Sequence, residues 1–127
     1  FIHPDDVEDT QQAVLTLTEG KMIAEFQGVQ WMIADMAIEI EAARLLVRQG
    51  ADLADRGRPH SEKVAIAKVL SNEMSMRVTT NVVQLMGAAG YSKEYPAERY
   101  MRDAKMFAIG GGTTQIQRTI IARGLLR

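Results

Sequence analysis

The chain has 127 residues, of which 46% are apolar and 24% are charged, with a formal net charge of −1. These values are typical of one globular domain with a real core, and the near-neutral charge excludes the basic footprint of a nucleic-acid-binding protein. Cysteine is absent, which excludes disulfides, thiolate catalysis and thiolate metal sites. The sequence contains no uncharged apolar run of about 18 residues, so we expect no membrane span.

The first twenty residues carry the weakest pattern. Pro4 and the two aspartates after it suit the start of a helix, and Gly20 suits its end. We predict a helical N-terminal segment over residues 1–19, followed by a helical domain over residues 20–127. The acidic start is unlike a secretory signal, which favours the cytoplasm, or the mitochondrial matrix in a eukaryote. Because the chain begins at Phe1 and not at Met, we expect a piece or processed form of a longer protein.

Residues 23–56 carry apolar side chains at three- and four-residue steps, which predicts one helix about 50 Å long. Methionine at helical spacing, as here, is far more often packing than a ligand-binding stripe. The apolar content around Trp31, Met32, Ile33 and Met36 is wider than one stripe. We therefore expect this surface to pack against a homo-oligomeric copy or a complementary subunit.

A loop with Gly57 and Pro59 comes next, and Ser61 is the expected N-cap of a second long helix that ends near Met86. The most punctuated stretch, residues 84–118, then holds five of the ten glycines.

In that stretch Gly87 suits a helix end, and Pro96 suits the first turn of a short helix over residues 97–107. Three glycines follow, and Thr113 or Thr114 is expected to cap the last helix, since Thr114 and Gln117 have capping-box spacing. No strand is predicted. The fold class is therefore all-α, an antiparallel four-helix-type bundle.

The same stretch resembles the C-terminal signature of the acyl-CoA dehydrogenase family, flavoproteins that desaturate fatty-acyl thioesters. The resemblance covers about residues 20–127. It is carried by Gln84, Gly87, Gly90–Tyr91, Glu94–Pro96, Glu98–Arg99, Arg102–Lys105, Gly112–Thr113 and Gln115–Arg118.

The resemblance implies the C-terminal helical domain of that family and FAD as its cofactor. By matching position, Thr113 and Gln115 would approach the flavin dinucleotide. Gln84, together with Gly87 and Gly90, would contact the flavin of a neighbouring subunit. Glycine lets a backbone approach a ligand closely, and amide side chains can bond phosphate, ribose or adenine.

Three positions depart from the family pattern. Gly111 stands where one branch carries its catalytic glutamate, Thr16 stands where the family has an arginine that meets the flavin phosphate, and Glu19 stands where the family has a phenylalanine. The remaining carboxylates of the signature, Glu94, Glu98 and Asp103, are interpreted as structural. The resemblance thus implies oxidoreductase chemistry on the CH–CH group of acyl-CoA thioesters, with no catalytic residue in this chain and no activity when it is alone. Acyl-CoA is expected as a substrate only if the family's other domains are supplied.

The alternative hypothesis is a non-catalytic oligomerisation or partner subunit derived from the same family.

A metal site is not expected, because neither His3 nor His60 follows a glutamate by three residues. Arg102 and Asp103 form a candidate ion pair, interpreted as a structural tie between the short helix and the bundle.

Overall fold

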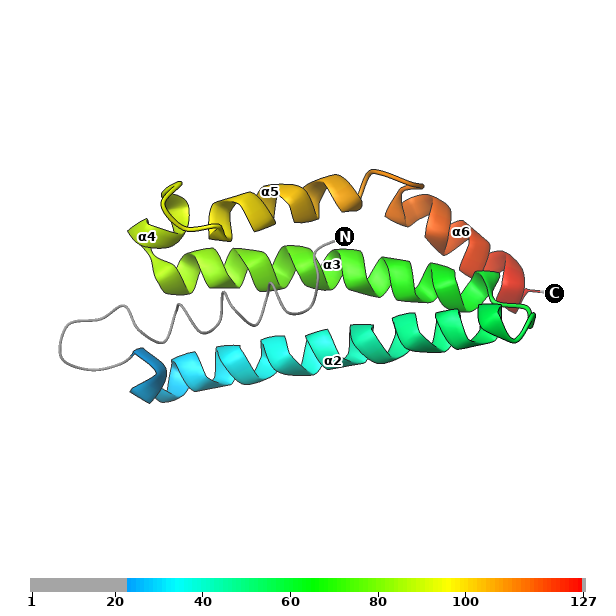
Figure 1. Ribbon diagram of the computed structural model, residues 1–127, viewed down its shortest axis with the longest axis horizontal. Helices are drawn as coiled ribbons and strands as arrows, with labels where there is room; N and C mark the ends of the chain where they lie inside the picture. Colours follow the sequence, from blue (N-terminus) through cyan, green and yellow to red (C-terminus); the bar gives the residue numbers. More distant parts are fainter. Residues whose placement is uncertain (1–22, 127) are drawn as a thin grey trace.

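Helix α3 forms the middle of the molecule in the computed structural model, which describes residues 23–126 (Figure 1). Helix α2 packs antiparallel along one side of α3, and α5 and α6 follow one another along the other side. The elements are the 3₁₀ turn η1 (Ile23–Glu25), α2 (Gln27–Asp55), α3 (Ser61–Met86), α4 (Ala88–Tyr91), α5 (Ala97–Phe107) and α6 (Thr114–Leu125). The predicted all-α antiparallel bundle is confirmed. The helix predicted within residues 1–19 lies outside the described residues.

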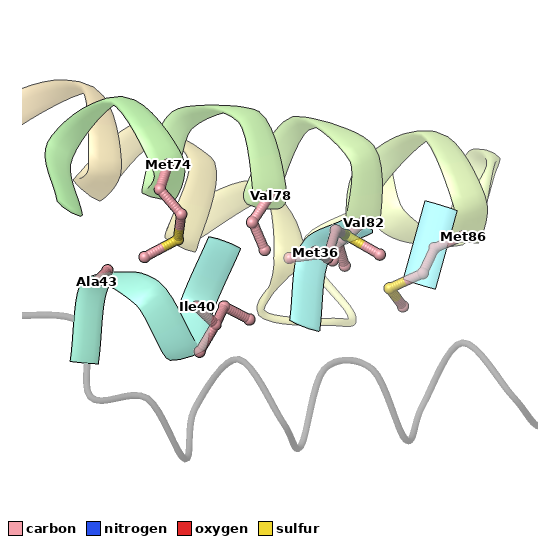
Figure 2. Packing of buried hydrophobic residues seen from close by; sticks show 8 residues of the cluster. Met36, Ile40, Ala43, Met74, Val78, Val82 and Met86 are labelled. Carbon is pink, nitrogen blue, oxygen red and sulfur yellow. The ribbon is translucent and has the colours of Figure 1, made fainter. Parts of the chain in front are cut away.

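The core lies between α2 and α3, where apolar side chains of the two helices face each other (Figure 2). Ala97 of α5 also belongs to this buried cluster. The buried members on α2 and α3 are spaced three or four residues apart, which places them on one face of each helix. They are Met36, Ile40 and Ala43 from α2 and Met74, Val78, Val82 and Met86 from α3. Burying each of the larger side chains contributes roughly 1.5–3 kcal/mol, so this face of α3 holds the long hairpin together.

The helix predicted over residues 23–56 starts later than expected, so its predicted first turn is wrong. The chain makes the short turn η1, leaves the helical conformation at Phe26 (φ −80°, ψ 124°) and begins α2 at Gln27. The side-chain amide of Gln30 donates to the carbonyl oxygen of Ala24 at 2.8 Å. That bond satisfies a carbonyl that a continuous helix would have bonded to a backbone amide.

The start of α3 also differs from the prediction by one residue. His60 is the N-cap, makes no capping side-chain bond, and places Ser61 inside the first helical turn. The ring Nδ1 of His60 lies 2.9 Å from the carbonyl oxygen of Arg58 instead, within the exposed loop. The predicted cap at Ser61 is therefore wrong, although the helix boundary is close to the predicted one.

Helix α3 ends at Gly87, whose φ of +58° belongs to the left-handed region that favours glycine. The chain then makes α4, a single helical turn over Ala88–Tyr91. Gly90 is buried in α4, and a Cβ there would lie 2.7 Å from the Cβ of Met86 and 2.8 Å from the carbonyl oxygen of Val83. Only a residue without a side chain allows this contact between α4 and α3.

Within residues 23–126, none of the helices combines the length and the apolar character that crossing a lipid bilayer requires. The compartment suggested by the sequence stays a prediction.

We predict that Gly90→Ala lowers the free energy of unfolding by about 1–3 kcal/mol, because the added methyl group overlaps backbone and Cβ atoms of α3. The matched control is Gly28→Ala, in the first turn of α2, where a Cβ meets nothing within 4 Å. That change should be neutral or stabilising by under about 1 kcal/mol, since alanine is the better helix former. Urea unfolding followed by circular dichroism measures both, and equal stabilities of the two variants would contradict this packing.

Candidate functional site

The loop between α5 and α6 has a backbone that depends on glycine. Gly111 and Gly112 adopt φ values of +64° and +92°, which side chains of L-residues rarely tolerate. A Cβ at Gly111 would also lie 2.9 Å from the Nζ atom of Lys68. The position at which one branch of the family has its glutamate is thus both left-handed and close to a cation in this chain.

Two side chains of α3 hold this glycine loop. The Lys68 ammonium donates to the carbonyl oxygen of Gly110 at 3.1 Å and to that of Gly111. The buried side-chain amide of Asn72, 7% exposed, donates to the carbonyl oxygen of Phe107 at 2.9 Å. Carbonyl groups at and beyond the end of a helix lack an intrahelical partner, and here α3 supplies the donors. A cation at the end of α5 is also favoured by the helix dipole.

Helix α6 starts directly after the loop. The hydroxyl oxygen of Thr113 accepts a hydrogen bond from the amide of Ile116 at 3.3 Å, so Thr113 is the N-cap. The predicted capping box of Thr114 and Gln117 is wrong, because Thr114 is the first residue of the helix and not its N-cap. Its side chain is buried. The backbone amide of Thr114 donates to the carbonyl oxygen of Ala108 at 3.4 Å, which ties the helix start to the end of α5.

The predicted cofactor residues fall into two groups. Thr113 and Gln115 lie together in the first turn of α6, with the Gln115 side chain exposed. Gln84 is exposed near the C-terminal end of α3, and Gly87 and Gly90 follow in the turn and in α4. We call these sets the α6 group and the α3 group.

The structure does not bring the two groups together. Asn72 marks the place on α3 where α5 ends, since its side chain bonds Phe107. Gln84 lies about 18 Å farther along α3 at 1.5 Å per residue. In Figure 1 the start of α6 and the junction of α3 with α4 are correspondingly far apart.

The α6 group offers hydrogen-bonding groups at the start of a helix. Amide groups at a helix start attract anions, and two of those in this first turn, from Thr114 and Ile116, are already bonded inside the chain. The side-chain oxygen Oε1 of Gln115 accepts a hydrogen bond from the Thr114 hydroxyl at 3.3 Å. Within the described residues, the backbone amides of Thr113 and Gln115 and the side-chain NH2 group of Gln115 remain to meet a ligand. The arrangement suits a partial contact with phosphate or ribose and does not form a complete binding site.

A cleft of about 750 Å³ lies beside the glycine loop, between α2, the first half of α3 and the end of α5. Its walls are mainly apolar, with Val47, Val64 and Phe107 among them, and Lys68 and Gly111 also line it. This volume is within the range of small-molecule sites. An apolar ligand in the cleft would lie next to the glutamate position of the family.

Glu98 and Arg102 of the signature pair with each other. The Nε atom of Arg102 lies 2.7 Å from Oε2 of Glu98, one turn earlier on α5. The predicted ion pair of Arg102 with Asp103 is therefore wrong. The interpretation of Arg102 as a tie between the short helix and the bundle is also wrong, because its partner is on the same helix. This bonded guanidinium holds the pKa of the Glu98 carboxyl below its ordinary value.

Helices α6 and α3 are joined instead by Arg118 and Glu73, Nη2 to Oε1 at 2.5 Å. In the described part of the chain no three His, Asp or Glu side chains gather as a metal site would require, and His3 lies outside it.

Residues 7–126 match the family model described as the C-terminal domain of acyl-CoA dehydrogenase. The chain belongs to the acyl-CoA dehydrogenase family. The resemblance noted in the sequence is thereby confirmed, and with it the identity of the fold as the family's C-terminal helical domain. The boundary at residue 20 stays a prediction.

Among acyl-CoA dehydrogenase relatives, a probable acyl-CoA dehydrogenase FadE25 of Mycobacterium tuberculosis is 50% identical over 109 residues, covering 85% of this chain and 28% of that protein. A 3-sulfinopropanoyl-CoA desulfinase of Variovorax paradoxus is also 50% identical, over 84% of this chain and 27% of its own. The structure of butyryl-CoA dehydrogenase from Megasphaera elsdenii superposes with a TM-score of 0.91 at 40% identity, covering 95% of this chain and 32% of that one. The chain spans less than a third of the length of the curated relatives named here.

Sequence reasoning missed Lys68 and Asn72. Both lie within the periodic apolar pattern of the second long helix, four residues apart and so on one face. A polar pair at that spacing in a half-buried stretch is the signal that was present, because buried polar groups require partners. The partners lie 35 to 43 residues away in the sequence, which no local pattern reveals.

Proposed function

We propose that this chain supplies the C-terminal helical part of an FAD-linked oxidoreductase that acts on the CH–CH group of acyl-CoA thioesters. The observation that carries the proposal is the start of α6, where the partly exposed Thr113 and the exposed Gln115 follow a glycine loop beside an apolar cleft. In this proposal Thr113 and Gln115 bind one flavin dinucleotide. Gln84, with Gly87 and Gly90, meets the flavin of a neighbouring subunit.

The separation of the α6 and α3 groups supports this division. Gln84 lies about 18 Å along α3 from Asn72, beside the end of α5, and α6 starts beyond that end, so the two groups suit contacts to two cofactor molecules better than one compact pocket. Solved relatives include a protein described as a FAD complex of PigA, with a TM-score of 0.87 at 29% identity. Another solved relative, a FAD-dependent dehydrogenase, has the same TM-score and identity. Both names are consistent with FAD as the cofactor proposed here.

The reaction proposed is removal of a proton from the α-carbon of the thioester and of a hydride from the β-carbon. FAD, when bound, supplies the hydride acceptor. This chain supplies hydrogen-bonding groups for the cofactor and an apolar wall beside Gly111. Gly111 has no side chain to accept the α-proton, and a positioned base is worth about 100- to 10,000-fold in rate. The base is therefore placed on another part of the assembly.

A second candidate is a non-catalytic subunit that kept the bundle and lost the base, and Gly111 is the observation that favours it. Flavin colour in the purified protein supports the first candidate. Its absence in the isolated chain is expected for both candidates, because only part of the cofactor's contacts is present in this chain. The relatives that match about equally well are called a dehydrogenase and a desulfinase. A CoA thioester substrate is common to both names, so the proposal is strongest at that level.

An exposed apolar row on α2 supports a homo-oligomer as the partner. Trp31, Ile38 and Leu45 are 63%, 67% and 56% exposed and follow one another at seven-residue spacing, which aligns them on one face. The surface expected from the sequence is different in detail. Met36 is only 2% exposed and belongs to the core, and Met32 is half-buried. We propose that the row of Trp31, Ile38 and Leu45, called here the α2 row, meets a second copy.

For self-association, we predict that light scattering coupled to gel filtration gives at least a dimer. Replacing Ile38 and Leu45 by Glu should shift the mass towards the monomer, because charges would have to be buried at the contact. Leu126→Glu is the control, since Leu126 is also exposed but lies at the end of α6. A wild-type monomer at every concentration tested would refute the proposed contact.

For flavin, we predict that the isolated chain binds FAD more weakly than micromolar. Only part of the cofactor's contacts is present, and the position of the phosphate-binding arginine is Thr16. Charge-assisted hydrogen bonds are about twice as strong as neutral ones, so this loss is large. A fluorescence titration measures it, with Gln115→Ala expected to weaken binding further. Micromolar or tighter binding would show that the helical domain contributes more than its contacts suggest.

For catalysis, we predict no turnover when this chain, FAD, an electron acceptor and a panel of acyl-CoA thioesters are mixed. The missing base corresponds to a barrier increase of roughly 3–5 kcal/mol. If turnover occurs, Glu94→Gln, Glu98→Gln and Asp103→Asn test the carboxylates interpreted as structural. Activity lost in one of these variants would identify a base wrongly interpreted, and activity kept in all three would indicate a base elsewhere in the chain.

A further inference from the structure

We propose that Lys68 and Asn72 are positioning residues, which set the conformation of the glycine loop and thereby the direction in which Thr113 and Gln115 face their ligand. The part of this inference that concerns the ligand rests on the proposed function. The part that concerns the loop stands on the geometry alone.

The loop has little conformational preference of its own. Gly110, Gly111 and Gly112 are consecutive, and glycine populates positive and negative φ about equally. The backbone hydrogen bonds at the loop are short-range, from Gly110 to Met106 at 2.8 Å and from Thr114 to Ala108 at 3.4 Å. Bonds of this kind can persist through several arrangements of the glycines, so they do not select one.

The contacts from α3 do select one arrangement. Lys68 reaches two successive carbonyl oxygens, of Gly110 and Gly111, and one ammonium can bond both only when they converge on it. Asn72, one turn farther along α3, fixes the carbonyl of Phe107 at the end of α5. Both donors stand on the most extensively packed helix of the described chain, which makes them a rigid reference for the loop.

Past the loop, α6 is attached to the same helix by the Arg118–Glu73 pair. Removing Lys68 therefore leaves α5 and α6 in contact with α3 and frees only the segment between them. The expected consequence is local opening of the loop without unfolding of the bundle. Local opening and global unfolding are separable by amide hydrogen exchange.

The first experiment measures hydrogen exchange by NMR in Lys68→Met, which keeps most of the aliphatic stem, and in Asn72→Leu. In Lys68→Met the amides of Gly110 and Thr114 should exchange at least about tenfold faster, because hydrogen bonds to a charged donor are among the stronger ones. In Asn72→Leu the same amides should also exchange faster, because the carbonyl of Phe107 loses its donor. The core amides of Val78 and Val82 should keep their rates.

The control for this experiment is Lys63→Met on the same helix. Lys63 makes no hydrogen bond to the glycine loop within the described residues, so its removal should leave loop exchange unchanged. Lys68→Arg keeps a cationic donor and should restore part of the protection. Unchanged loop exchange in both Lys68→Met and Asn72→Leu overturns the proposal. An equal acceleration of every amide also overturns it, because that result describes general stability.

The second experiment adds FAD to millimolar concentration and follows the amide signals of Thr113 and Gln115. In the wild type these signals should shift, and in Lys68→Met the apparent dissociation constant should rise at least about threefold, with Lys63→Met like the wild type. If Lys68→Met and the wild type bind FAD equally although the loop exchanges faster in the variant, the proposal that Lys68 positions the ligand contacts is overturned. Faster loop exchange with no FAD-induced shift in any protein supports the role of Lys68 in the loop and refutes the cofactor role of the α6 group.

Discussion

Everything else in the described structure depends on the burial of α3 against other helices on two sides. Towards α2 it presents methionine and valine, whose large side chains fill the space between the two long helices. Towards α5 the contact uses small residues, and Ala97 and Ala104, two turns apart on α5, are almost completely buried. Small side chains let helix axes approach closely. This close approach brings the end of α5 within reach of Lys68 and Asn72.

The candidate site follows from that arrangement. A loop of glycines is flexible by itself, yet here it connects two helices that are both attached to α3. It receives two hydrogen bonds from Lys68, and Asn72 bonds the last residue of α5 just before it. The flexible backbone of the glycine loop, which can approach a ligand closely, is thus supported by the rigid helix α3. The α3 group lies at the far end of the same helix, so one element sets the distance between the two sets of candidate contacts.

Gly111 illustrates how conformation and chemistry interact at this site. The residue lacks a proton-accepting group, and its left-handed backbone is one that a side chain would strain. The space where a side chain would begin is close to the Lys68 ammonium, which is bonded to the loop's own carbonyls. The glycine at position 111 and the loop held by Lys68 are thus compatible features in this chain.

The sequence by itself determined the helices, their approximate ends and the family. Apolar periodicity, glycine at a helix end and a threonine at a helix start are local features, decided by residues within about one turn of one another. The signature from Gln84 to Arg118 is likewise a linear pattern, readable without a fold. Tertiary structure alone decided which apolar residues face outwards, as with Trp31 and Met36, which the sequence had grouped together. It also decided that Gly90 must be glycine and that Lys68 and Asn72 hold a loop 35 to 43 residues away. The physical reason is that these contacts join side chains and backbone from different helices, and only the packing of α3 against its neighbours brings them together.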